Sequence, residues 1–133
     1  MGAVGAAGKA GELITEARRH LGARYVWGKA GPDVFDCSGL VIYSLKKIGV
    51  PAPRFTTATF GTWAKANGAI RLSPDQFRAG DVILRTGHMG IATSATTMIH
   101  APNVTTVVKE VDIYSKSTWW GWRLFGTFTA EKK

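Results

Sequence analysis

The spacing of apolar positions changes once along this chain, from a helical period in the first half to a strand period in the second. Apolar side chains recur every three or four positions in residues 11–22, which end at Gly22. The same period fills residues 37–48, and a shorter stretch covers residues 59–66. The pattern therefore predicts three helices in the first half of the chain.

The helix over residues 37–48 has the clearest end signals. The carboxylate of Asp36 can accept hydrogen bonds from the free amides of a first turn, so Asp36 is predicted to be the N-cap. Two lysines in the last turn suit the negative end of the helix dipole, and Gly49 can take the left-handed conformation that ends a helix. Cys37 is thereby placed at the first helical position.

Strand-like runs begin after Asp81 and are separated by glycine, serine and asparagine. They cover residues 82–84, 89–93, 97–100, 104–111 and 122–128. Helices followed by a series of short strands are typical of an α+β fold. We therefore expect N-terminal helices packed on a C-terminal antiparallel sheet of about five strands.

The length of 133 residues suits one domain with one core, and we assign residues 11–130 to it. Residues 1–10 are small and glycine-rich, which is typical of a flexible lead-in, and they lack the basic start and apolar block of a secretory signal. The chain has one cysteine, so it cannot form an internal disulfide. It has no run of 18 or more apolar residues, so we expect no membrane span.

The chain is strongly basic, with a net charge of +8. Such a field attracts anionic partners, and nucleic acid, anionic lipid and anionic wall polymers all fit it. The basic residues are scattered and form no long run, which is equally consistent with a generic solvated surface. Charge alone does not choose among these partners.

Cys37 is the first candidate for chemistry. At the start of a helix, free amides and the positive end of the dipole stabilise a thiolate, so we expect the pKa of this thiol to be lowered. Gly39 is unusual inside a helix, where it costs about 1 kcal/mol relative to alanine, and the close approach of another backbone or of a substrate would explain it. An inert core cysteine is the competing interpretation, because free cysteines are often buried as small hydrophobic residues.

Two of the three histidines could serve Cys37. His88 follows a glycine turn at the start of a predicted strand, and His100 ends the next apolar run. On adjacent strands the two could be cross-strand neighbours, with one ring orienting the other. His20 stands beside two arginines and is interpreted as a surface residue without a role.

Metal binding competes for the same three residues. Zinc ligands usually come in pairs separated by two to five positions. Cys37, His88 and His100 are far more widely spaced, so a zinc site is disfavoured and we expect neither a metal nor another cofactor. The chain also lacks a serine nucleophile elbow and a phosphate-binding loop.

Six short blocks surround these candidates in a characteristic order. They are Tyr25–Gly28, Phe35–Val41, Pro53–Arg54, Gly80–Val82, Gly87–Ile91 and Met98–Ala101. In sequence and approximate spacing they resemble the NlpC-type cell-wall peptidases, a branch of the papain-like cysteine peptidases, over about residues 12–128. The Asp-Cys-Ser-Gly-Leu block is the specific signal, and the other blocks count in combination.

The resemblance implies a papain-like α+β fold, with the cysteine on a helix packed against an antiparallel sheet that bears the histidine. It implies that Cys37 is the nucleophile, His88 the base and His100 the polar residue that orients the base. Members of the family cleave peptide stems of peptidoglycan, commonly between γ-linked D-glutamate and a diamino acid. The expected substrate is therefore the peptidoglycan stem peptide.

The resemblance also implies substrate contacts. Tyr25 matches a family tyrosine near the thiol, and Asp36 and Ser38 match positions that help to bind the stem peptide. The sequence departs from the family where Lys29 replaces a second glycine, and where residues 91–94 are less bulky than usual. These departures affect the shape of the groove more than the chemistry.

An extracellular or cell-wall location, including a virion-associated one, follows from this interpretation. Anionic wall polymers remain a second expected partner through the basic surface, whereas nucleic acid is not expected. Two alternatives stay open: an amidase or acyltransferase with the same Cys-His site, and a wall-binding or virion module without catalysis.

Overall fold

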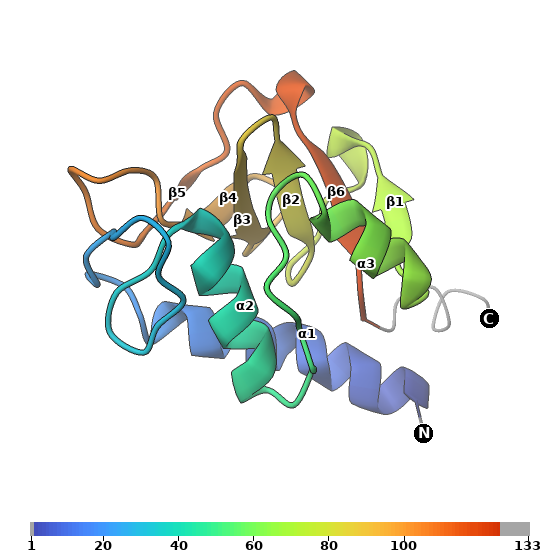
Figure 1. The fold of residues 1–133 in the computed structure, drawn as a ribbon. Helices are drawn as coiled ribbons and strands as arrows, with labels where there is room; N and C mark the ends of the chain where they lie inside the picture. Colours follow the sequence, from blue (N-terminus) through green and yellow to red (C-terminus); the bar gives the residue numbers. More distant parts are fainter. Residues whose placement is uncertain (1, 126–133) are drawn as a thin grey trace.

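The computed structural model describes residues 2–125, which form helices on an antiparallel sheet (Figure 1). The helices are α1 (Gly2–Arg18), α2 (Cys37–Lys47) and α3 (Phe60–Ala66). The strands are β1 (Ile70–Leu72), β2 (Val82–Arg85), β3 (His88–Ala92), β4 (Thr97–His100), β5 (Lys109–Asp112) and β6 (Trp120–Arg123), with 3₁₀ turns η1 (Pro74–Gln76) and η2 (Lys116–Thr118). The predicted α+β class is confirmed.

The sheet has the strand order β1-β6-β2-β3-β4-β5, and every neighbouring pair is antiparallel. Strands β2 to β5 follow one another as a meander, whereas β6 returns to the other side of β2 and pairs with β1. Figure 1 shows α2 lying across one face of this sheet, with α1 running beneath it. The arrangement brings the N-terminal end of α2 to the start of β3.

The main core lies between α2 and the sheet. Leu40, Val41 and Leu45 of α2 are fully buried, as are Met89 and Ile91 of β3. Burial of one such side chain stabilises the fold by about 1.5–3 kcal/mol. Because side chains alternate across a strand, the neighbours of Met89 and Ile91 point to the other face of the sheet.

A smaller apolar cluster covers that other face. It comprises Leu72, Phe77, Ile83, Ala92, Met98 and Trp119. Trp119 is only 2% exposed and Trp122, in the main core, is 7% exposed. These two tryptophans therefore serve for packing.

Two element boundaries differ from the prediction. The first helix begins at Gly2 and ends at Arg18 rather than covering residues 11–22. No proline stands between residues 2 and 18, so the backbone can continue as a helix through the expected lead-in. The chain leaves the helix before Gly22, whose amide bonds to the carbonyl of Val108 at 2.9 Å.

The predicted strand over residues 104–111 is shortened to β5. The side chain of Asn103 accepts hydrogen bonds from the amide and hydroxyl of Thr105 at 3.1 and 2.7 Å, which makes a local turn instead of a strand. The short strand β1 was not predicted, because three residues give too little alternation. The last predicted strand, over residues 122–128, is observed as β6, which begins two residues earlier and ends at Arg123; residues 126–128 of that prediction lie outside the described residues.

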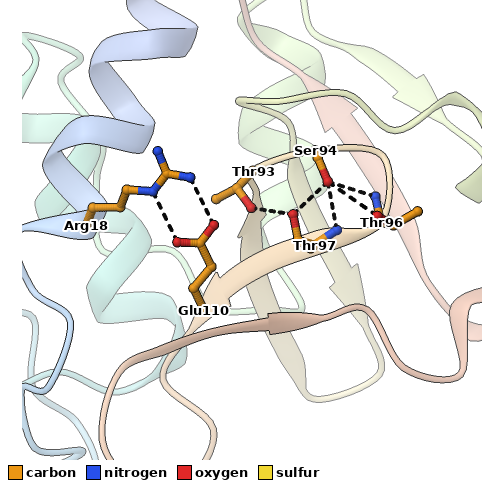
Figure 2. A network of polar contacts seen from close by, with 6 residues as sticks. All are labelled: Arg18, Thr93, Ser94, Thr96, Thr97 and Glu110. Atoms are coloured by element: carbon orange, nitrogen blue, oxygen red, sulfur yellow. Dashed lines mark hydrogen bonds and ion pairs between the residues drawn. The ribbon is translucent and has the colours of Figure 1, made fainter.

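A polar network ties the end of α1 to the far edge of the sheet (Figure 2). The guanidinium of Arg18 donates to both carboxylate oxygens of Glu110 on β5, at 3.1 and 2.9 Å. Beside this pair, the hydroxyl of Thr97 contacts those of Thr93 and Ser94 at 2.7 and 2.6 Å, which closes the β3–β4 turn.

No helix in residues 2–125 has the length and apolar character to cross a membrane.

Candidate active site

Cys37 is the first residue of α2, as predicted. Asp36 has an extended backbone and its Oδ1 atom accepts a hydrogen bond from the amide of Gly39 at 2.6 Å, so the predicted N-cap is confirmed. Gly49 has a φ of +91° and follows the last turn of the helix. The local sequence therefore fixes where the thiol stands on the helix.

The glycine inside α2 is explained by the close approach of another backbone segment. A Cβ atom at Gly39 would lie 2.0 Å from the carbonyl oxygen of Lys29 and 2.8 Å from the Cα atom of Ala30. The loop before α2 therefore crosses the helix directly above its first turn. The missing side chain lets this loop form one wall beside Cys37.

Asp36 is the centre of a polar cluster. Its Oδ2 atom accepts from the amide of Gly28 at 2.9 Å and from the guanidinium of Arg54 at 3.0 Å. The Ser38 hydroxyl donates to Oδ1 at 3.2 Å and accepts from Arg54 at 3.1 Å. Asp36 thus fixes the helix start, the preceding loop and the segment after α2 in one arrangement.

A cleft opens on this cluster, which we call the Cys37 cleft. It is lined by Tyr25, Trp27, Gly28, Asp36, Cys37, Ser38, Arg54, Thr56, Thr57 and Gly87. Four of the six site residues predicted from the sequence, namely Tyr25, Asp36, Cys37 and Ser38, meet in it. Cys37 is partly exposed, which argues against an inert core cysteine.

The two histidines form a hydrogen-bonded pair on β3 and β4. His88 Nε2 and His100 Nδ1 are 2.7 Å apart, and the antiparallel pairing of Ile91 with Ile99 sets the register of the two strands. Gly90 makes room for this contact, because a Cβ atom there would lie 3.1 Å from the Cβ of His100. The predicted cross-strand relation is confirmed, and Nδ1 of His88 is left for another partner.

The cysteine and the histidine pair meet at the start of β3. The backbone amide of Met89, the residue after His88, lies close enough to the thiol of Cys37 to act towards a lower pKa of that thiol. Gly87, the residue before His88, lines the Cys37 cleft. The structure thus brings the helix start and the histidine strand together around the sulfur.

The expected lowering of the thiol pKa is wrong. Burial and then the negative charge of Asp36 raise the pKa of Cys37, although the amides of Met89, Ser38 and Cys37 itself act in the opposite direction. The sequence argument considered the helix amides but not the carboxylate that caps the same helix. Burial, Cys37 and Asp36 likewise raise the pKa of the nearby Tyr25 hydroxyl.

Burial lowers the pKa of both histidines to about 4. The charge of Arg85 adds to the effect on His88, and the charges of His88 and then Lys109 add to that on His100. At neutral pH both the thiol of Cys37 and the imidazole of His88 are therefore neutral in the resting protein. A neutral imidazole can accept a proton, which is what a general base requires.

Sequence reasoning missed two prominent features of the cleft. The sequence pattern indicates Arg54 only as part of a Pro-Arg block, although its side chain contacts both Asp36 and Ser38. Trp27 lines the cleft with 79% of its surface exposed. The two prolines that precede Arg54 restrict its backbone and could have drawn attention to it. Nothing in the local sequence pattern, however, showed where its side chain would point.

His20 is not the surface residue that was expected. Its ring packs against those of Phe35, in a tilted arrangement, and Tyr43, edge-on, at centroid distances of 4.8 and 5.2 Å, and its Nε2 atom contacts Glu16 at 2.8 Å. It supports the loop before α2 and lies outside the Cys37 cleft. Within residues 2–125, no group of three or more histidine, cysteine or acidic side chains could hold a metal ion.

A cysteine at a helix start, packed against an antiparallel sheet with a histidine pair, defines the class of the papain-like cysteine peptidases. Residues 22–125 match the NlpC/P60 family. The chain therefore belongs to the NlpC/P60 family.

The chain is similar to curated proteins that are named as probable endopeptidases. The chain is 34% identical over 119 residues to the probable endopeptidase p60 of Listeria welshimeri, which covers 86% of this chain and 21% of that protein. It is 32% identical over 101 residues to the probable endopeptidase Cgl2188 of Corynebacterium glutamicum, covering 74% of this chain and 46% of that protein. The chain thus spans between a fifth and a half of these two relatives, whose names support its assignment as a peptidase.

Solved structures share the fold. The NlpC/p60 domain of the peptidoglycan hydrolase SagA matches with a TM-score of 0.70 and 27% identity, over 84% of this chain and 97% of that domain. Rv1477, a hypothetical invasion protein of Mycobacterium tuberculosis, matches with a TM-score of 0.77 and 24% identity, over 94% of this chain and 66% of that structure. The second likeness concerns the fold alone.

Proposed function

We propose that this chain is a cysteine endopeptidase that hydrolyses the peptide stems of bacterial peptidoglycan in the cell wall. One observation carries the proposal: the thiol at the start of α2 lies near the backbone amide that follows His88, and His88 is hydrogen-bonded to His100. Cys37 is the nucleophile, His88 the base, and His100 the residue that orients the base. The bond between γ-D-glutamate and a diamino acid is the proposed site of cleavage.

The reaction is an acyl transfer through a thioester. As the sulfur of Cys37 attacks the amide carbonyl, its proton passes to His88, and backbone amides at the start of α2 stabilise the oxyanion. The C–N bond breaks and His88 gives the proton to the leaving amine. Water, activated by His88, then attacks the thioester and releases the acid and the thiol.

The Cys37 cleft provides groups to hold the stem. Tyr25, Asp36 and Ser38 are the proposed substrate contacts, and Asp36 also caps the helix. Arg54 joins them because its guanidinium already contacts Asp36 and Ser38 in the same cleft. A negative and a positive side chain next to each other suit a stem that carries both an ammonium and a carboxylate.

The basic surface favours association of the protein with the anionic cell wall. The net charge of +8 favours anionic wall polymers as a second partner outside the cell. Binding through scattered charges is screened by salt, so association with whole walls is expected to weaken as ionic strength rises. Cleavage of small soluble stem peptides is expected to respond less.

The test is digestion of purified peptidoglycan followed by mass analysis of the fragments. The wild-type protein is expected to release new free amines and fragments cut inside the stem, whereas Cys37→Ala loses at least about a thousandfold in rate with an unchanged unfolding midpoint. His20→Gln is the matched control, because it removes a histidine that lies outside the cleft.

Three other results would overturn the proposal. Release of the intact stem means an amidase, sedimentation with walls without new amines means a binding module, and full activity of Cys37→Ala excludes the thiol mechanism. A salt-dependent gel shift with nucleic acid, in the absence of wall cleavage, would move the function to a different class.

A further inference from the structure

The loop between β5 and β6 covers the histidine pair with aromatic rings. The ring of Trp119 packs against that of His88 at a centroid distance of 5.9 Å, and the ring of Tyr114 packs against that of His100 at 6.1 Å. The two aromatic rings touch each other at 5.7 Å. Each imidazole therefore has its own aromatic neighbour from one short loop.

Arg85 completes this cover from the sheet. It ends β2 directly opposite His88 in the β2–β3 register. Its guanidinium carbon lies 5.4 Å from the ring centroid of Tyr114 and 5.8 Å from that of Trp119. The charge is thereby held beside the histidines by two cation–π contacts.

The loop has a fixed shape. The indole Nε1 of Trp119 donates to the carbonyl of Tyr114 at 2.7 Å, and the hydroxyl of Thr118 donates to the backbone carbonyl of Ser115 at 2.7 Å. Ser115 has a φ of +48°, the one positive φ of a non-glycine residue in the described part of the chain. Such a conformation costs about 1–2 kcal/mol, so the surrounding contacts must hold it in place.

We infer that Trp119, Tyr114 and Arg85 are positioning residues that hold the His88–His100 pair in the orientation that attack by Cys37 requires. This inference rests on the proposed function, because it assigns the three residues a role in the attack by Cys37. They act through the histidines and do not themselves line the Cys37 cleft. The rings restrict rotation of the imidazoles, and the fixed guanidinium disfavours a second positive charge next to it.

The other groups around the pair do not replace Arg85. The thiol of Cys37 lies near the backbone amide of Met89 on β3, and Lys109 on β5 acts on His100. Arg85 is the permanently charged group that acts on His88 itself. Removing its charge is therefore expected to raise the pKa of His88.

The experiment compares Arg85→Met, Arg85→Lys and Arg71→Met. Arg71 stacks on Trp120 at 5.5 Å on the same sheet, without a histidine next to it, so Arg71→Met controls for loss of a cation–π contact. Histidine titrations are followed by NMR in the Cys37→Ala background, which needs no activity. The kcat and KM are measured with the intact cysteine on a soluble stem peptide.

The expected result is a His88 midpoint that moves to higher pH in Arg85→Met, with kcat lowered between about 10- and 100-fold and KM unchanged. Arg85→Lys restores most of both values, and Arg71→Met changes neither. Trp119→Phe, which removes the bond to the Tyr114 carbonyl, is expected to lower kcat in the same way.

An unchanged His88 midpoint together with an unchanged kcat in Arg85→Met would overturn the inference. So would an equal loss of kcat in Arg71→Met. Failure of the proposed function is a separate outcome, because a wild-type protein that cleaves no stem peptide can still show the shifted His88 titration of Arg85→Met.

Discussion

The two sides of the site differ in where their polar environment comes from. On the cysteine side, Cys37, Asp36 and Ser38 are consecutive residues at one helix start, in an open cleft. On the histidine side, His88 on β3 is half-buried and His100 on β4 is buried, and both lie beneath rings from a distant loop. The first side is therefore organised by local sequence, and the second by tertiary contacts.

The difference also extends to charge. The pKa of the thiol is raised by burial and by Asp36, a carboxylate that the helix needs as its cap. The pKa of each histidine is lowered mainly by burial. Both shifts favour the neutral forms, so the proton is expected to move from sulfur to imidazole only as substrate is attacked.

On the histidine side, the largest expected effect comes from removing the base. His88→Ala leaves Cys37 without a proton acceptor, and kcat for stem cleavage is expected to fall about 10²–10⁴-fold. His20→Ala serves as the control, because that ring lies under the loop before α2 and is expected to affect the unfolding midpoint rather than kcat. Steady-state kinetics on a soluble stem peptide measure both, and equal losses in kcat would contradict the division of roles.

The cysteine side depends on a close approach that tolerates no side chain. Gly39→Ala would force a Cβ atom against the Lys29 carbonyl, so the free energy of unfolding is expected to fall by about 3 kcal/mol. Gly11→Ala is the matched control, because that helical position has open space around it and the change is expected to be stabilising by up to about 1 kcal/mol. Urea denaturation measures both, and a neutral Gly39→Ala would mean that the loop can move away.

The sequence predicted most of the cysteine side, because its signals are local. The cap at Asp36, the helix start at Cys37 and the constraint at Gly39 each depend on neighbouring residues, and the structure confirms all three. The places of Arg54 and Trp27 in the cleft were not predicted, and neither was the raised pKa of the thiol. That pKa depends on the balance between amides and a carboxylate, and only geometry decides that balance.

The histidine side was predictable only as a pairing. Alternation of apolar residues on two strands separated by a short turn predicted that His88 and His100 would be neighbours. Nothing in the sequence connected Trp119, Tyr114 or Arg85 with them, because these residues approach through a loop and a sheet edge that periodicity does not describe. The boundary of β5 was missed for a similar reason, since a side-chain turn at Asn103 overrode an apolar run.

Acidification is expected to test the histidine side alone. Both folded-state pKa values are about 4 against 6.5 for an unperturbed histidine, so the unfolded chain binds protons first as the pH falls. The stability is complete above pH 6.5 and is lost as the pH falls from there towards 4. Between pH 7 and pH 5 the free energy of unfolding is expected to fall by about 2 kcal/mol for each of the two histidines.

Urea denaturation at the two pH values measures this loss. The double variant His88→Gln/His100→Gln is the control, since it removes the titrating pair and is expected to show a much smaller difference. An unchanged loss in that variant would assign the pH dependence to other groups.

The smallest and most selective change is Asp36→Asn. The amide keeps one oxygen for the helix cap, but its NH₂ group faces the donors of Gly28 or Arg54, so stability is expected to fall by about 1–2 kcal/mol. Loss of the negative charge is expected to lower the pKa of Cys37 and to speed alkylation of the thiol at neutral pH. Asp33→Asn, an exposed carboxylate in the same loop, is the matched control and is expected to change neither.

The same substitution separates the two sides of the site. Asp36 acts on the thiol, whereas burial and Arg85 set the pKa of His88, so Asp36→Asn is expected to shift the alkylation profile without moving the His88 titration. If both move together, the thiol and the imidazole titrate as one coupled pair. The contrast between a cysteine organised by local sequence and a histidine pair organised by tertiary contacts would then not apply to their protonation.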